Sequence, residues 1–484
     1  MKMNKDDYQV FNLFVKSCLL PWDKIKNLSY DDLRKLTVEL IIRADCNQKC
    51  EYCYLTHKGL DLFPIEERTS KEKILQNIKT FLEYCLDNNI YQMVWDFFAG
   101  DLFYDDLFFD IMELFYNYYQ KIEEQCPEFK DKAKKDHGCI NIPCNLSFIA
   151  DDKKTQRVQN IIDDFKENLG IIIRFSWSTD GFYATSTREK KELTEEYFDK
   201  GFNFCKKNNY SFHPMISALN IDNWIKNYDW WVKKYQQYFY DDFINIQPPM
   251  LEVRDNNWTK DKIIKYIELL NHIIDTQFEI CGKDLKTFSI YKFGNKHQFN
   301  NVGLSEYNVF MDPTRIFQSF DEKGSQNYMN CSLGKSLTIN CYNLDIVPCH
   351  RTAYSFLRGG HFVIENNKII GTEPYESFFA YMNLVLKNPS MGLRCNHCKY
   401  KIICMKQCAG ACIENIGDYS IPCNTVCDLL ENKYSFLIHK YEQMGVFNFI
   451  LENLRECFPL TGGKLREFIL ELKNMEGLLI NEDC

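Results

Sequence analysis

The sequence predicts an α/β protein whose core is a parallel sheet curved into a partial, TIM-like barrel of six β/α units. From Leu36 to about Pro249, short runs rich in β-branched residues alternate with longer amphipathic segments. Strands joined by helical crossovers pair in parallel, and the helices cover the sheet. Six strands are two short of the eight that close a barrel, so an open barrel is expected. A cysteine-rich segment and a helical tail follow it.

Each strand and helix of this unit has its own signal. The first strand, Leu36–Ile42, is an almost continuous apolar run. The first helix begins at a capping box, Thr69-Ser70-Lys71-Glu72, and its apolar face holds Ile74, Ile78, Phe81, Leu82 and Cys85. Further strands are expected at Met93–Phe98, Ile140–Phe148, Ile171–Ser178, Phe212–Ser217 and Phe243–Gln247. Further helices are expected at Asp105–Glu123, Lys153–Asn168, Glu189–Asn208 and Asn223–Phe239.

The composition excludes several classes of protein. A net charge of −9 over 484 residues argues against an enzyme that binds RNA through its phosphates. No stretch approaches the roughly 18 apolar residues of a membrane span, and the first residues form no signal peptide. We therefore expect a cytoplasmic protein without membrane or nucleic-acid partners. There its 22 cysteines stay reduced and serve metals or cores rather than disulfides.

A loop directly after the first strand holds Cys46, Cys50 and Cys53 in a Cys-x3-Cys-x2-Cys pattern. Three thiolates on one loop suit a soft metal centre. Structural zinc and ordinary iron–sulfur clusters use four protein ligands, so three cysteines leave one iron open to a substrate. With 22 cysteines in 484 residues, this spacing arises by chance only about 0.05 times per chain, so it is informative.

The loop, with Tyr52 just before its third cysteine, resembles the signature of the radical S-adenosylmethionine (SAM) enzymes. The resemblance implies a 4Fe–4S cluster held by Cys46, Cys50 and Cys53, whose open iron binds the amino and carboxylate groups of SAM. It also implies cleavage of SAM to methionine and a 5′-deoxyadenosyl radical, which abstracts hydrogen from the substrate.

The loop after the second strand contains Ala99, Gly100 and Asp101. It is similar to the family's Gly-Gly-Glu-Pro loop, which receives the amino group of SAM, although the first glycine and the proline are missing. Gly100 would let the backbone approach closely, and Asp101 would take the place of the glutamate. The alternative is a plain strand-to-helix turn.

Later strand ends also resemble SAM-contacting motifs of the family. The third strand ends in Cys144-Asn145-Leu146, which resembles the family's Thr-Asn-Gly turn with only Asn145 retained. Ser178 and Asp180 match a Ser-x-Asp-Gly motif and would meet the ribose or methionyl carboxylate of SAM, although such residues also suit any tight turn. Asn220 lies where relatives carry an asparagine near the adenosine.

The sixth strand leads into Glu252 and Arg254, which we expect either at the barrel mouth facing substrate or as a rim ion pair of small energetic value. His213, near the fifth strand, is expected to be an interior histidine. The aromatic residues between Trp224 and Tyr240 have helical spacing and are expected to pack rather than to stack on bases.

Ten of the 22 cysteines fall between Cys331 and Cys427. A predicted hairpin, Ser336–Asn340 with Asp345–Pro348, leads to Cys349. The series as a whole resembles the SPASM extension of radical SAM peptide-modifying enzymes, which holds two auxiliary 4Fe–4S clusters. Leu344 replaces a glycine of that pattern.

The resemblance implies a ligand set for each auxiliary cluster. One cluster would use Cys395, Cys398, Cys404 and Cys427. The other would use Cys331, Cys349 and Cys408, with Cys341, Cys412 and Cys423 as alternatives for its fourth ligand. An incomplete set would leave an iron open to a substrate thiolate, as in thioether-forming relatives.

The function implied is a radical SAM peptide maturase that acts on a ribosomally made precursor peptide and forms a cysteine thioether crosslink. Formylglycine formation, epimerisation and carbon–carbon crosslinking are the alternatives. Sulfatase-maturing relatives have an aspartate as presumed base where this chain has His350. From another class, an iron–sulfur electron carrier or a zinc-stabilised binding protein would need the cysteines but not the SAM loops.

The expected cofactors are three 4Fe–4S clusters and SAM, and the expected electron donor is a low-potential flavodoxin or ferredoxin. The predicted segments are a lead-in at 1–35, the barrel at 36–300, the auxiliary-cluster region at 301–430 and a helical tail at 431–484.

Overall fold

The computed structural model describes residues 4–34, 36–48, 50–55, 62–184, 193–212, 214–239, 250–251, 257–293, 333, 336–386, 393–400, 403–404, 408–457 and 462–478. The chain divides into two compact units, each built from separate stretches of sequence. Unit 1 comprises Met1–Thr179, Thr194–Phe212 and Cys331–Pro389; unit 2 comprises Asp180–Leu193, His213–Asn330 and Ser390–Cys484. The segment boundaries expected at residues 35, 300 and 430 stay predictions.

Unit 1 is organised on a nine-stranded sheet with the order β11-β10-β9-β8-β1-β2-β3-β4-β5. Neighbouring strands from β8 through β1 to β5 pair in parallel. β1 to β5 lie in sequence order, as expected for successive β/α units. The strands are β1 (Val38–Arg43), β2 (Val94–Ala99), β3 (Cys139–Cys144), β4 (Ile172–Trp177), β5 (Ser211–Phe212), β8 (Leu337–Asn340), β9 (Asp345–Val347), β10 (Gly360–Glu365) and β11 (Lys368–Pro374).

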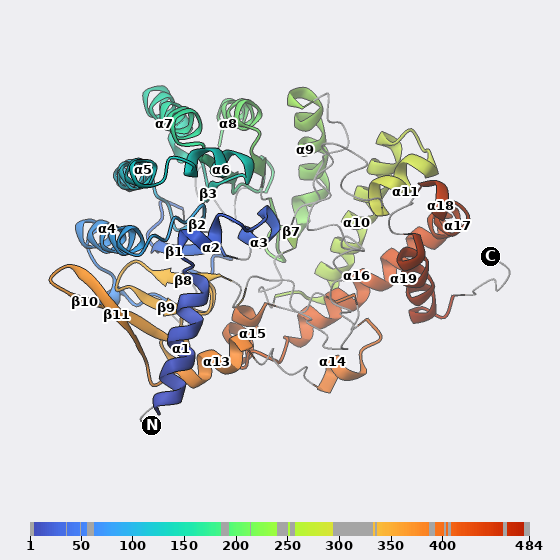
Figure 1. Ribbon diagram of the computed structural model, residues 1–484. Helices are drawn as coiled ribbons and strands as arrows, with labels where there is room; N and C mark the ends of the chain where they lie inside the picture. The colour runs from blue at the N-terminus through green and yellow to red at the C-terminus, as the bar shows by residue number, and fades with distance from the viewer. Residues whose placement is uncertain are drawn as a thin grey trace. The chain divides into compact units, whose positions relative to one another are not determined.

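Helices cover the outer face of β1 to β4, as Figure 1 shows. They are α4 (Lys71–Asp87), α5 (Leu107–Gln125), α6 (Phe129–Lys135), α7 (Asp152–Asp164) and α8 (Glu195–Asn208). Trp95 is fully buried and packs edge-on against Phe115 of α5, with ring centroids 5.0 Å apart. Phe175 of β4 meets Phe108 of α5 in the same layer. Burial of each such side chain stabilises the fold by about 1.5–3 kcal/mol.

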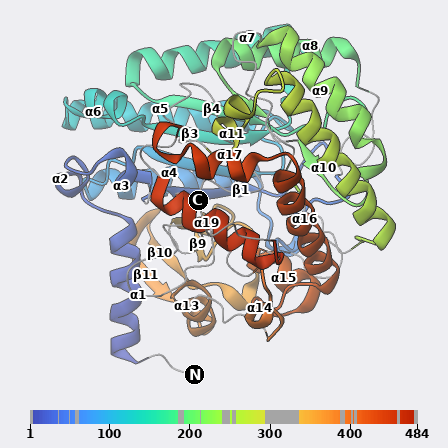
Figure 2. The same ribbon diagram turned by 90° about the vertical axis from the view of Figure 1, so that its right-hand side faces the viewer.

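Two hairpins extend the sheet beyond β1. β8 and β9 are antiparallel, and the turn between them holds Leu344 at φ 62°, a conformation that favours glycine. β10 and β11 form the second hairpin. α1 (Lys5–Cys18) packs on β11, and the Tyr8 hydroxyl donates a hydrogen bond to the Thr372 carbonyl at 2.8 Å; Figures 1 and 2 both show α1 beside this hairpin.

Short helices complete unit 1: α2 (Trp22–Ile25), α3 (Tyr30–Arg34), α13 (Phe378–Leu386), and the 3₁₀ helices Ile65–Glu67, Ser147–Ala150 and Ser355–Leu357. A π-helical turn, Phe165–Leu169, follows α7.

Unit 2 is mostly helical, and in its described part α10 packs along α16. Its helices are α9 (Trp224–Tyr238), α10 (Lys260–Ile280), α11 (Leu285–Phe293), α14 (Leu393–His397), α15 (Ala409–Ile416), α16 (Asn424–Gln443), α17 (Val446–Glu452), α18 (Leu454–Cys457) and α19 (Gly462–Met475), with a 3₁₀ turn at Ile221–Asn223. The parallel strands β6 (Met215–Ile216) and β7 (Met250–Leu251) form a separate pair.

The predicted α/β class, with a parallel sheet and a helical C-terminal region, is confirmed. The structure corrects several element boundaries. Ser70, not Thr69, caps α4. β3 ends at Cys144 because Leu146 is left-handed, with φ 54°. The helix expected from Glu189 begins at Glu195.

The fifth predicted strand is divided between β5 and β6, which belong to different sheets. The sixth, Phe243–Gln247, lies outside the described residues. The aromatic residues between 224 and 240 were expected to pack within a helix. This is confirmed for Trp224, Tyr228, Trp230 and Trp231, which are buried in α9. No helix in the described part of the chain is long and apolar enough to cross a membrane.

Candidate functional site

The three-cysteine loop leaves the carboxyl end of β1 and packs directly on the loop that follows β2. The Gly100 N–H donates a hydrogen bond to the Arg43 carbonyl at 2.9 Å, and the Asp101 N–H donates to the Asp45 carbonyl at 2.8 Å. A Cβ placed on Gly100 would lie 2.1 Å from the Asp45 carbonyl oxygen. Only glycine therefore allows this close approach one residue before Cys46.

Asp101 is almost fully buried beneath this contact. Its carboxylate accepts the Phe103 N–H at 2.9 Å and the Ser147 hydroxyl at 3.1 Å. Burial raises the pKa of Asp101, although the Phe103 N–H, Ser147 and Asn145 oppose that shift. A carboxylate has about four lone-pair sites, so Asp101 keeps the capacity to accept a further donor.

Cys46, Cys50 and Cys53 are half-buried, and Tyr52 between them is buried. The Gln48 N–H donates to the Cys46 sulfur at 3.4 Å, and the Cys53 N–H donates to the Cys50 carbonyl at 3.1 Å. The loop thus carries three thiols, and hydrogen bonds hold both its first residues and the turn from Cys50 to Cys53. Across the described residues, no three His, Cys, Asp or Glu side chains are arranged to hold a metal ion.

The end of β3 meets the cysteine loop. The Asn145 amide donates to the Asn47 side-chain carbonyl at 2.8 Å, and the Asn145 carbonyl accepts the Tyr197 hydroxyl at 2.8 Å. Ser178, which follows β4, donates its N–H to the Cys144 carbonyl at 2.7 Å. The structure therefore places the cysteine loop, Asp101, Asn145 and Ser178 at the carboxyl ends of adjacent strands, where parallel β/α units carry functional groups.

Asp180 and Asn220 lie in unit 2, and both are buried. The Asp180 carboxylate accepts the Met215 N–H at 3.0 Å, and the Asn220 amide lies 3.5 Å away. The Asn220 side-chain carbonyl accepts the Trp224 indole N–H at 2.8 Å. These two predicted SAM contacts are part of an internal hydrogen-bond network, and their role in binding SAM stays a prediction.

His350 is held by a buried glutamate that the sequence analysis missed. Glu39, in β1, is 1% exposed and accepts the hydroxyls of Ser336 at 2.9 Å and Thr338 at 2.8 Å. Its second oxygen lies 3.5 Å from His350 Nδ1. Burial acts to raise the pKa of Glu39, but His350 and the two hydroxyls outweigh it, so the net shift is downward.

The His350 ring stacks on Phe98 with centroids 3.6 Å apart and lies 5.8 Å from the Tyr54 ring. Phe98 precedes the Ala99-Gly100-Asp101 loop, and Tyr54 follows Cys53. His350 thus touches both loops of the candidate SAM site.

Cys349 is buried beside His350, and its sulfur accepts the Arg351 N–H at 3.2 Å. Cys341, also in unit 1, is buried at the end of β8, where its N–H donates to the Ile41 carbonyl at 2.8 Å. Burial alone raises the pKa of the Cys341 thiol. The predicted site residues Glu252, Arg254 and Cys331 lie outside the described residues, as does His213, which was expected to be an interior histidine.

Unit 2 brings most of the other predicted cysteine ligands onto neighbouring segments. Burial raises the pKa of the Cys427 thiol to about 12, Arg394 opposes the shift, and nearby Cys404 and Cys395 add to it. Cys395 and Cys398 are linked by a backbone hydrogen bond of 3.2 Å.

Two of the alternatives for the fourth auxiliary ligand also lie in unit 2. Cys412 lies one turn into α15, and its N–H donates to the carbonyl of Cys408, the residue at the N-cap position, at 2.9 Å. Cys423 lies at the N-cap position of α16, and its sulfur contacts the Thr425 hydroxyl at 3.2 Å.

Arg394 joins the helix that carries Cys395 to the helix that carries Cys427. Its guanidinium donates to Asn424 Oδ1 at 3.0 Å, to Asp428 Oδ1 at 2.7 Å and to Glu431 Oε1 at 3.0 Å. These three acceptors follow one face of α16 on either side of Cys427. The planar guanidinium of Arg394 can donate to several acceptors at once, which suits it to hold the helix of Cys395 in one position along α16.

We therefore expect Arg394→Ala to lower iron content by about four atoms per chain after anaerobic reconstitution, while the Tm changes little because exposed ion pairs contribute only about 0–1 kcal/mol. Lys399→Ala is the matched control, since Lys399 pairs with Glu476 at 2.9 Å and belongs to the same cysteine-rich stretch. Equal iron in the two variants would contradict the role given to Arg394.

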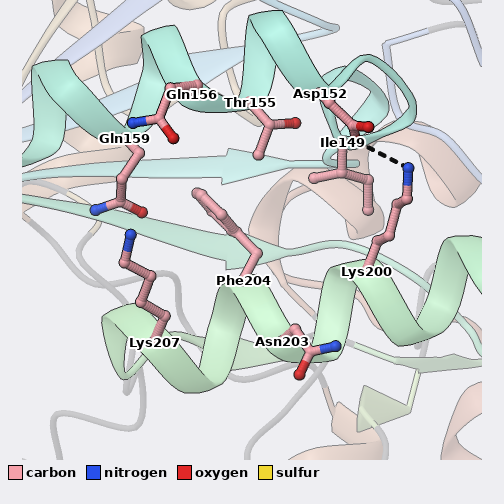
Figure 3. A pocket seen from close by; sticks show the side chains of 9 residues that line it. All are labelled: Ile149, Asp152, Thr155, Gln156, Gln159, Lys200, Asn203, Phe204 and Lys207. Atoms are coloured by element: carbon pink, nitrogen blue, oxygen red, sulfur yellow. Dashed lines mark hydrogen bonds and ion pairs between the residues drawn. The ribbon is translucent and has the colours of Figure 1, made fainter.

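A hollow of about 300 Å³ lies between α7 and α8 on the outer layer of unit 1 (Figure 3). Lys200 and Lys207 line it on α8, and Asp152 lines it on α7. Lys200 is paired with Asp152 at 2.9 Å, so part of the positive charge is already offset. No residue of the sequence-predicted site lines this hollow.

No protein-family model matches the chain, and no curated protein matches it. The chain is similar to a solved structure of Streptococcus suis SuiB bound to the precursor peptide SuiA. The two share 16% identity with a TM-score of 0.37, and the match covers 81% of this chain and 75% of that chain. A second crystal structure of Streptococcus suis SuiB is similar at 14% identity and a TM-score of 0.36, covering 81% of this chain and 76% of that chain.

Proposed function

We propose that this chain is a radical SAM enzyme that modifies a ribosomally made peptide. One observation carries the proposal most strongly. Three cysteines follow the first strand of a parallel sheet, and Gly100 and Asp101 pack on that same loop with no room for a side chain at Gly100. A buried carboxylate beside three half-buried thiols suits a cluster whose open iron takes a ligand with an amino group.

The donor chemistry fits the proposed cofactors. Cys46, Cys50 and Cys53 would hold the first cluster, and Asp101 would accept the SAM amino group, with Asn145 and Ser178 at the neighbouring strand ends. When bound, the cluster and SAM together supply a 5′-deoxyadenosyl radical for hydrogen abstraction. The chain's own residues would orient SAM, with the Asp101 carboxylate held in place by the Phe103 N–H and the Ser147 hydroxyl.

Within this class, the proposed reaction is a cysteine thioether crosslink on the precursor peptide, with electrons from a flavodoxin or ferredoxin. Cys395, Cys398, Cys404 and Cys427 would hold one auxiliary 4Fe–4S cluster. Cys331, Cys349 and Cys408 would hold the other, with Cys341, Cys412 and Cys423 as alternatives for the fourth ligand. Formylglycine formation, epimerisation and carbon–carbon crosslinking are the competing reactions.

The proposal is tested by giving dithionite and SAM to the anaerobically reconstituted protein and measuring 5′-deoxyadenosine. Formation of 5′-deoxyadenosine supports SAM chemistry. A reconstituted protein that carries iron or zinc but releases none would instead be an iron–sulfur carrier or a zinc-stabilised binding protein.

We expect Asp101→Ala to weaken SAM binding and slow SAM cleavage by about tenfold or more, because one charge-assisted hydrogen bond contributes roughly 1.5–3 kcal/mol. Iron content should stay unchanged, since Asp101 is assigned to the amino group and not to iron. Asp105→Ala is the control: Asp105 also follows β2 but pairs with Arg43 at 2.6 Å. Unaltered SAM cleavage in Asp101→Ala would show that the loop is only a turn.

A further inference from the structure

A row of polar side chains crosses the inner face of the unit 1 sheet. Strand register aligns Glu39 of β1 with Thr338 of β8 on one side and with Asp96 of β2 on the other. Asp96 in turn aligns with Asn141 of β3, and Asn141 aligns with Arg174 of β4. Residues paired in this way point to the same face of a parallel sheet.

The row faces away from the helices. Trp95, next to Asp96, packs on α5, and Phe175, next to Arg174, packs on α5 and α8. Because successive side chains alternate between the two faces, Asp96 and Arg174 lie on the opposite, inner face. The Asn141 amide donates to Asp96 at 2.6 Å, which places these two on one face as well.

The inner face becomes more accessible toward β4. Glu39 is fully buried, whereas Asp96, Asn141 and Arg174 are half-buried. On β4, Ile172, Arg174 and Ser176 are all half-buried, while the alternate residues Ile173, Phe175 and Trp177 are buried. A sheet face intended only for packing would carry apolar residues at these positions.

Arg174 stands out because no carboxylate pairs with its guanidinium in the described part of the chain. Charged groups withdrawn from water are normally paired. Beside it, the hydroxyls of Ser176 and Ser211 lie 3.4 Å apart and add polar atoms.

We propose that Arg174 binds an acidic side chain of the peptide substrate, a role that rests on the proposed function. The guanidinium fork matches a carboxylate. β1 and β2 carry the carboxyl groups Glu39 and Asp96 in this row, whereas β4 carries the guanidinium of Arg174, so an acidic side chain is favoured over β4 and the bound segment gains a direction. The charged row thus selects peptides whose acidic residue lies over β4.

The test uses reconstituted holoenzyme and labelled octapeptides, acetylated and amidated at their ends, that differ only in a central Asp, Asn or Lys. By fluorescence anisotropy, we expect the native protein to bind the Asp peptide about tenfold more tightly than the Asn peptide and to bind the Lys peptide least. Arg174→Gln should erase this preference, and Arg174→Lys should keep part of it. Arg157→Gln is the matched control, since Arg157 lies on the outer layer over the Phe109 ring.

Equal binding of the Asp and Asn peptides by the native protein, or a preference retained in Arg174→Gln, would overturn the proposal. A loss of SAM affinity in Arg174→Gln with the peptide preference intact would assign the guanidinium to SAM instead and also overturn it. Iron content and 5′-deoxyadenosine are measured on the same samples. A peptide preference that depends on Arg174 in a protein that cleaves no SAM would support this site and refute the proposed function.

Discussion

Replacing Cys46, Cys50 and Cys53 together by alanine is expected to abolish 5′-deoxyadenosine formation and to lower iron from about twelve to about eight atoms per chain. The three thiols are the proposed ligands of the SAM-binding cluster, so no iron remains at which SAM can be cleaved. Because the cysteines are half-buried on a loop, the fold should persist. Iron analysis and circular dichroism of the reconstituted variant check both statements.

Cys144→Ala is the control for this experiment. Cys144 is buried at the end of β3, and its sulfur accepts the Leu146 N–H at 3.2 Å. Its pKa is raised by burial and by nearby Asp101 and Cys46, so it neighbours the site without being an assigned ligand. This variant should keep all of its iron. Zinc in place of iron, or only four irons in the native protein, would refute the three-cluster assignment.

Glu39→Ala is expected to lower the free energy of unfolding by about 3–5 kcal/mol. The change removes a buried carboxylate and leaves His350, Ser336 and Thr338 without their shared acceptor. Urea denaturation measures the effect. Glu66→Ala, an exposed glutamate in the 3₁₀ turn Ile65–Glu67, should change stability by less than about 0.5 kcal/mol.

The stability difference between the native protein and Glu39→Ala should depend on pH. The pKa of Glu39 is lowered in the folded state, so its stabilising contribution is present in full above the unfolded pKa of about 4.3 and is lost as the pH falls through the folded value. The stability difference between the two proteins should therefore shrink as the pH falls below about 4.3. A difference that is constant from pH 7 to pH 3 would contradict a charged Glu39.

Patterns within short stretches of sequence were sufficient to predict β1 and the helices of the outer layer. The apolar run at β1 and the helical face of α4, with Ile74, Ile78 and Phe81 all buried, were predicted from periodicity. A further signal was present but unused: Asn366 and Asn367, at φ 51° and 61°, form the two-residue turn between β10 and β11.

The polar row could not be predicted, because its residues belong to different strands and each lies among apolar neighbours. Glu39 looks like an interruption of β1 until its partner Thr338 is known, and strand register is not encoded in any local pattern. The same limit applies to His350, whose contacts with Phe98 and Tyr54 come from distant segments. The site motifs could be found because the residues of each motif lie close together in the sequence. The residues that hold these motifs in place come from distant segments, so the sequence did not reveal them.

The pairing of β1 with β8 has a consequence for biosynthesis. Ser336 and Glu39 are 297 residues apart, so at 5–20 residues per second about 15–60 s separate their emergence from the ribosome. Until then one edge of β1 is open to mispairing. The Ala44 N–H, two residues before Cys46, is held by the Tyr342 hydroxyl at 2.7 Å. The cysteine loop thus gains this anchor only after Tyr342 has been synthesised, and iron insertion at the proposed cluster is expected to follow that step rather than precede it.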